Sequence, residues 1–161
     1  MRLMTWFRAS TWVTLCFVAT VSLSVNAHKL ADDASAEERA FVYRDSLFHV
    51  LGWKTTILFD MAKGNRAQDP ALFAATAREI AMLAPFIPEG FIPNSVVEES
   101  LALPEIWENF DDFKEKASDL EKAALNLADV AEKDYKKATG MLRKFAGNCG
   151  GCHREYKVDE D

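Results

Sequence analysis

The chain has 161 residues, of which 49% are hydrophobic, and its 25 acidic side chains outnumber its 19 basic ones, giving a formal charge of −6. This length suits one ordinary domain, and the negative charge disfavours nucleic acid and anionic membrane surfaces as partners. A negative charge can attract basic partners electrostatically. The plainer interpretation is that the acidic side chains only form a solvated surface.

The first 27 residues have the pattern of a secretory leader. Two arginines precede an apolar run from about Trp12 to Leu23, and Val25-Asn26-Ala27 supplies small residues for cleavage. The run is about 12 residues long, short of the ~20 that span a bilayer. We expect cleavage after Ala27 and export to the periplasm, with no membrane attachment of residues 28–161; an uncleaved anchor is the alternative. The leader holds two basic and no acidic residues, so the mature charge is −8.

The first predicted helix begins near Ser35, where Ser35 and Glu38 form an S-x-x-E capping box, and ends at Gly64-Asn65. Its apolar residues form two neighbouring stripes at helical spacing: Phe41, Phe48, Gly52 and Phe59, then Leu47, Leu51, Leu58 and Met61. A face this wide predicts contact with more than one neighbour.

Asp69-Pro70 predicts the start of a second helix, with aspartate as the N-cap and proline at the first helical position. Pro85 and Pro88 are expected to end it. The residues from there to Leu103 form a long connection, which is unusual in a compact domain and is often functional. A simple crossing of one end of the molecule is the alternative.

Pro104-Glu105 predicts the start of a third helix, with apolar residues recurring at steps of three and four up to Val130. Asp134 is expected to cap a fourth. On it, steps of four and three define one seam: Ala138, Leu142, Phe145, Cys149, Cys152 and Tyr156. No convincing period-two strand is present. The sequence therefore predicts an all-α fold, an antiparallel four-helix bundle over residues 28–161.

The segment Cys149-Gly150-Gly151-Cys152-His153 reads C-x-x-C-H, the attachment signature of c-type haem. Thiols at i and i+3 lie on one helix face, where both can form thioethers with the vinyl groups of one porphyrin. His153 follows where its imidazole can bind the iron. The sequence therefore predicts one covalent haem c on the C-terminal helix.

Two other interpretations of the cysteine pair stay open. A thioredoxin-like redox pair requires a βαβ context that the sequence lacks. A zinc site requires two further ligands, and only His28 and His49 remain, without metal spacing. The third cysteine, Cys16, lies inside the leader, so the mature chain has no disulfide framework.

Three segments together resemble the cytochrome c′ family across essentially the whole mature chain. They are Tyr43-Arg44-Asp45-Ser46-Leu47-Phe48, Leu103-Pro104-Glu105-Ile106-Trp107, and the C-terminal run from Cys149 to Lys157. The resemblance implies that Cys149 and Cys152 bind the haem and that His153 is the proximal iron ligand.

Other roles follow from the same resemblance. It implies that Arg44 lies near a haem propionate, that Phe48 lies over the sixth iron position, and that Asp45 occupies a haem-contacting position usually held by glutamine. A carboxylate there would repel the propionates. Lys157 stands where many members have arginine. The lysine keeps the positive charge but lacks the planar guanidinium group, whose donors can bind a carboxylate at two points.

The leading functional hypothesis is a non-enzymatic haem protein with five-coordinate, high-spin iron that binds NO or CO and is able to transfer electrons. Some low-spin relatives use a methionine of the first helix as sixth ligand, but no methionine occurs between Ala27 and Met61. A low-spin electron carrier with a sixth protein ligand is the alternative. His49 is a candidate for that ligand, but a surface or interhelix position is expected for it. A peroxidase would need a distal acid–base group.

Members of the family commonly form dimers through their first two helices, so the resemblance also makes a homodimer an expectation. The sequence does not identify a redox partner.

Overall fold

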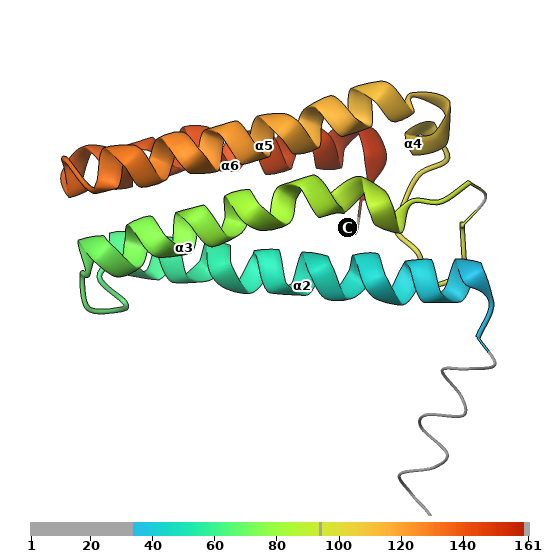
Figure 1. Cartoon of the computed structure of the whole chain (residues 1–161), viewed down its shortest axis with the longest axis horizontal. Helices are drawn as coiled ribbons and strands as arrows, with labels where there is room; N and C mark the ends of the chain where they lie inside the picture. The colour runs from blue at the N-terminus through green and yellow to red at the C-terminus, as the bar shows by residue number, and fades with distance from the viewer. Residues whose placement is uncertain (1–33, 94, 160–161) are drawn as a thin grey trace, which may run out of the picture. The chain divides into compact units, whose positions relative to one another are not determined.

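The computed structural model describes residues 34–93 and 95–159. The predicted leader, residues 1–27, and the fold of residues 28–33 lie outside this part. The described elements are α2 (Ala36–Lys63), α3 (Pro70–Leu83), the 3-10 helix η1 (Ala84–Gly90), α4 (Glu105–Glu108), α5 (Phe110–Ala131) and α6 (Tyr135–Tyr156). The four long helices alternate in direction along the chain (Figure 1), which confirms the antiparallel four-helix bundle.

The helix starts follow the predicted caps. The Ser35 hydroxyl accepts a hydrogen bond from the Glu38 N–H, and the Glu38 carboxylate accepts one from the Ser35 N–H, which completes the capping box. Asp69 and Asp134 cap α3 and α6, where each carboxylate accepts a hydrogen bond from the N–H three residues later, without the reciprocal bond of a capping box. α2 ends where predicted, at Gly64, whose φ of 79° is the left-handed conformation that glycine adopts without strain.

One predicted boundary was confirmed and another was wrong. The second helix ends at Leu83, before Pro85 and Pro88, as predicted, and the chain continues as the tighter 3-10 helix η1, with Pro85 in its first turn, where a missing N–H has no partner to lose. The third helix is divided at Asn109, whose φ of −122° and ψ of 42° leave the helical region. The Asn109 side-chain amide donates to the Glu105 carbonyl, the local competition that breaks helices at asparagine.

The core is made by the apolar residues that the sequence predicted to face inward, namely the second stripe of the first helix, the apolar positions of the third and the seam of the fourth. α5 packs against α3 and α6, and α2 packs against α3 and, over fewer residues, α6. The second stripe of α2 is buried, as are the members of the α6 seam other than the two cysteines: Ala138, Leu142, Phe145 and Tyr156. The stretch Pro70–Gly90 has the length and hydropathy of a membrane span, yet Phe73, Ala77 and Ile80 are buried among the other helices. It is a core element of the bundle.

The long connection closes one end of the bundle. The Leu103 N–H donates to the Tyr156 carbonyl at 3.0 Å, and the Val158 N–H donates to the Leu101 carbonyl at 2.9 Å. These bonds frame a single antiparallel bridge between Ala102 and Lys157. The connection is therefore held against the C-terminal end of α6, next to the C-x-x-C-H segment.

Replacing Gly140 by alanine is expected to raise the free energy of unfolding by about 1 kcal/mol, the difference in helix propensity. Gly140 is exposed on α6, and no atom lies within 4 Å of the place a Cβ would take. Denaturant unfolding of the holoprotein measures the change. Gly90→Ala is the opposite control, because its Cβ would lie 2.6 Å from the Arg44 Cβ and must destabilise. A Gly140→Ala protein less stable than the parent would contradict this placement.

Candidate haem-binding site

A cavity of about 480 Å³ lies between α2, η1, α5, α6 and the long connection. The volume is in the range of cofactor pockets. The sequence-predicted site residues all line it: Arg44, Asp45, Phe48, Cys149, Cys152 and His153. The connection contributes Glu99, Ser100, Leu101 and Ala102, so it forms one wall of the site. Gly140, Gly147, Gly150 and Gly151 do not line the cavity, so these glycines do not make room for a macrocycle.

The C-x-x-C-H segment is part of α6, which places both thiols on one helix face. Cys149 and Cys152 are half-buried, and neither is in a disulfide. His153 is exposed at the cavity rim, and partial burial lowers its pKa below the ordinary value, with the Lys157 cation acting in the same direction. The imidazole is therefore held in the neutral form that binds metals.

The thiols lack the character of a redox-active pair. Burial raises the pKa of Cys149, and it raises the pKa of Cys152 to about 11. Reactive dithiols instead have a lowered pKa, because the thiolate is the nucleophile. In residues 34–93 and 95–159, no group of three or more His, Cys, Asp or Glu side chains could hold a metal ion, which also removes the zinc interpretation there.

The wall opposite α6 comes from α2. Phe41, Phe48 and Gly52 belong to the first apolar stripe, and all three line the cavity, whereas the second stripe mostly enters the helix core. The wide apolar face of α2 thus serves the core and the site together. The Phe48 ring stands edge-on to Phe91, with centroids 6.3 Å apart, and Phe91 in turn packs 4.7 Å from Phe113. Phe48 is held from behind by a buried aromatic ring.

Arg44 is a buried cation at the edge of the cavity. Only 3% of it is exposed, and its guanidinium donates to the carbonyls of Gly90 and Ser95 and to the hydroxyls of Ser95 and Ser100. The Phe91 ring lies 5.1 Å from it. Burial lowers the pKa of Arg44, although a guanidinium remains charged. Within the described residues no carboxylate pairs with Arg44, which leaves a buried positive charge facing the site.

His49 lies on the outer side of α2. Its side chain is 79% exposed, and Nδ1 lies 2.9 Å from the Asp45 carbonyl oxygen and 3.5 Å from the Asp45 carboxylate. It does not line the cavity. The surface position expected for His49 is confirmed, and His49 is not placed to be a sixth ligand, because one residue beyond Phe48 turns the side chain roughly 100° around the helix.

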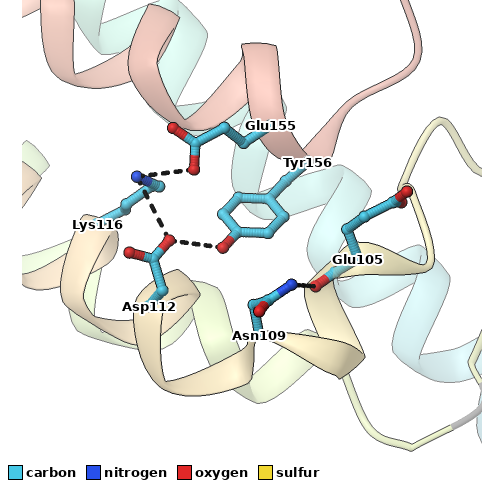
Figure 2. A network of polar contacts seen from close by, with 6 residues as sticks. All are labelled: Glu105, Asn109, Asp112, Lys116, Glu155 and Tyr156. Carbon is cyan, nitrogen blue, oxygen red and sulfur yellow. Dashed lines mark hydrogen bonds and ion pairs between the residues drawn. The ribbon is translucent and has the colours of Figure 1, made fainter.

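A polar network joins α5 to the last turn of α6 (Figure 2), and two of its residues, Lys116 and Tyr156, line the cavity. The Tyr156 hydroxyl donates to the Asp112 carboxylate at 2.5 Å, and this bond lowers the pKa of Asp112. Lys116 pairs with Glu155 at 3.1 Å and with Asp112 at 3.4 Å. Burial raises the pKa of Tyr156, so its hydroxyl stays a donor. The network fixes the turn that carries His153.

The comparisons with known proteins decide the family. The family model described as Cytochrome C' matches residues 39–157, which contain every element of the cavity. The chain belongs to the cytochrome c′ family.

Members of the family carry covalently attached haem c, so this chain is a haem c protein. Cytochrome c-554 of Cereibacter sphaeroides is 35% identical over 129 residues, 78% of this chain and 97% of that protein. Cytochrome c-556 of Agrobacterium tumefaciens (strain apple 185) is 32% identical over 73% of this chain and 94% of that protein. The solved cytochrome c prime from Shewanella frigidimarina has a TM-score of 0.70 at 29% identity, covering 79% of this chain and all of that one.

The residues of this cytochrome c′ cavity fit haem c. Two thiols on one helix face match its two vinyl positions, and the neutral imidazole beside them is a group of the kind that binds haem iron. Arg44, buried without a carboxylate partner, matches the negative charge of a propionate. The aromatic wall made by Phe48 and Phe91 matches the apolar macrocycle.

Sequence reasoning missed several residues of this cytochrome c′ site. Phe91, Ser95 and Ser100 lie in the connection, where no periodicity marks a buried residue, yet they surround Arg44 and Phe48. Lys116 of α5 also lines the cavity. The sequence did not mark it as a site residue, because charged positions on a helix usually face solvent. Tyr156 belonged to the predicted seam, but its bond to Asp112 joins residues 44 positions apart.

Proposed function

We propose that this chain is a periplasmic cytochrome c′ whose iron is five-coordinate and binds NO or CO. Cys149 and Cys152 hold the haem, and His153 is the axial ligand. One observation carries the proposal: among the described residues that line the cavity, His153 is the single histidine and there is no methionine. The periplasmic location is supported by the leader pattern of residues 1–27.

Bound haem would supply an iron atom with one position free for a diatomic ligand. The side chains of this chain define that position. Phe48 and Leu51 present hydrocarbon to it and offer no hydrogen-bond donor, so they exclude water and disfavour oxygen, whose bound form gains from polar donors. His153 stays neutral, Arg44 holds a propionate, and the Asp112–Tyr156 bond fixes the helix turn below.

Ligand binding is proposed rather than catalysis. A peroxidase needs an acid–base group over the iron. The histidine nearest to Phe48 in sequence is His49, which is turned outward from the cavity. Asp45 also lines the cavity, but its side chain is about half exposed and interacts with His49. Its predicted contact with the haem remains a proposal.

Replacing Phe48 by alanine is expected to raise the association rate of NO by about tenfold or more, since tenfold corresponds to ~1.4 kcal/mol of activation free energy. The ring shields the iron position and must move aside before a ligand enters. Stopped-flow absorbance of the ferrous holoprotein measures the rate. His49→Ala on the outer side of the same helix is the control and should leave the rate unchanged. An unchanged rate in Phe48→Ala would remove the shielding role.

We further propose that α2 pairs with α2 of a second copy. Its outer face exposes large apolar side chains that soluble monomers seldom gather: Val42 is 61% exposed, Val50 44% and Trp53 65%. A helix face of this kind is self-complementary in a twofold dimer.

Trp53→Glu is expected to convert a dimer into a monomer, because it replaces the most exposed large side chain of the apolar face by a charge. Light scattering of the holoprotein across a concentration series measures the mass. Leu125→Glu on α5, at a position 44% exposed, is the matched control and should leave the mass unchanged. A wild-type protein that is monomeric at high concentration would contradict the pairing.

A further inference from the structure

The exposed side of α6 carries a set of basic residues, called here the basic face: Lys136, Lys137, Arg143, Lys144 and Arg154. All five are exposed. The helix itself contains one acidic residue, Glu155, and that carboxylate is paired with Lys116 of α5 at 3.1 Å. Along α6 the surface charge is therefore positive, in a protein whose mature formal charge is −8.

The charges of the basic face are not neutralised by the rest of the described chain. No residue of the face takes part in an ion pair among residues 34–93 and 95–159, whereas cations elsewhere, such as Lys54, Arg78 and Lys122, are paired with carboxylates. Unpaired cations gathered on one surface produce a local field opposite in sign to the net charge. Such a field attracts an acidic surface and fixes its orientation.

Glycines lie between the cations and bring the helix backbone to the surface. Gly140 and Gly147 are exposed, and no atom lies within 4 Å of the place where either would carry a Cβ. Gly150 and Gly151, which lie between the two cysteines, continue this row of glycines along α6. Only the Arg154 side chain lies near the places where they would carry a Cβ; its Nη1 is 3.4 Å from that place on Gly150. A partner seated here would approach the backbone of the C-x-x-C-H segment with only the Arg154 side chain, itself a member of the basic face, in between.

We infer that the basic face of α6 docks an acidic surface of a one-electron redox protein, which exchanges an electron with the haem iron across the Gly147–Gly151 backbone. In the reducing direction the partner's centre is oxidised by one electron and ferric iron becomes ferrous, with no bond made or broken. The inference rests on the proposed haem function. Anionic lipid is the competing acidic surface, and it is disfavoured because the mature charge of −8 repels an extended negative plane.

The test uses the holoprotein and the dianionic ferrous EDTA complex as a one-electron reductant. Attraction by the basic face predicts that the reduction rate falls by roughly threefold to tenfold as ionic strength rises from about 10 mM to 100 mM, because salt shortens the Debye length. Control of the rate by the net charge predicts the reverse, a rate that rises with salt. Stopped-flow absorbance of the haem measures both.

Variants assign the effect to the face. Arg143→Glu with Lys144→Glu should abolish the fall with salt or invert it. Lys63→Glu with Arg66→Glu makes the same change in net charge at the α2–α3 turn, the opposite end of the bundle from the C-terminal end of α6 (Figure 1), and should retain the fall. A wild-type rate that rises with salt, or two double variants that behave alike, would overturn the proposal, and so would binding of the wild-type holoprotein to phosphatidylglycerol vesicles. A protein that lacks haem or does not bind NO would instead contradict the proposed function.

Discussion

Replacing Cys149 and Cys152 together by serine is expected to abolish covalent haem attachment. A serine hydroxyl does not form the thioether, and the structure brings no other thiol of the described chain to the cavity. Each single variant should retain at most one bond and a reduced haem yield. The measurement is haem staining after denaturing electrophoresis, with the pyridine haemochrome spectrum reporting the number of saturated vinyl groups.

The chain offers a matched control for this experiment in Cys16, which belongs to the predicted leader. Cys16→Ser makes the same chemical change and should leave the mature protein fully loaded. Haem that survives denaturation in the Cys149→Ser, Cys152→Ser protein would contradict the assignment. A coloured but non-covalent product would show that the cavity still binds the macrocycle without the sulfurs.

Replacing Arg44 by methionine is expected to lower the free energy of unfolding by several kcal/mol, because each buried acceptor left without a donor costs about 1–3 kcal/mol. Methionine fills much of the same volume but leaves the Gly90 and Ser95 carbonyls and the Ser95 hydroxyl without the donor they have in the parent, while Ser100 keeps its bond from the Ala102 N–H. The connection that forms one wall of the cavity would lose its main anchor to α2. Denaturant unfolding of the holoprotein measures the change.

Two further variants separate the causes of this loss. Arg39→Met lies on the same helix at an exposed position and should change stability by less than about 0.5 kcal/mol. Arg44→Lys keeps the charge but lacks the planar fork that reaches Ser95 and Gly90 together, so it should lose most of the same stability. An Arg44→Met protein as stable as the parent would show that the buried guanidinium does not hold the connection.

The features of the fold that the sequence predicted are those determined by interactions between residues close together in the sequence. Ser35, Asp69 and Asp134 were identifiable as caps because each accepts a hydrogen bond from a backbone N–H three residues later. Gly64 was identifiable as an end because it adopts a positive φ. The break at Asn109 was not predicted, because the apolar periodicity runs through this position and does not show that the Asn109 side chain bonds to the Glu105 carbonyl.

The same division applies to the site. The C-x-x-C-H residues could be identified because their chemistry is encoded within five consecutive positions. The surroundings of Arg44 could not, because its partners Ser95 and Ser100 lie 51 and 56 positions away in a connection without periodicity. Phe48 was identified only through the family resemblance, and the ring that supports it, Phe91, carries no sequence signal.

The central claim is that His153 alone binds the iron from the protein side and that an apolar wall faces the other side. The absorption spectrum of the purified holoprotein, ferric and ferrous and then with NO added, tests it most directly. The account predicts high-spin ferric bands and a ferrous spectrum that changes when NO binds. Split low-spin bands in the ferrous protein before any ligand is added would contradict it, because they would require a sixth ligand from the chain.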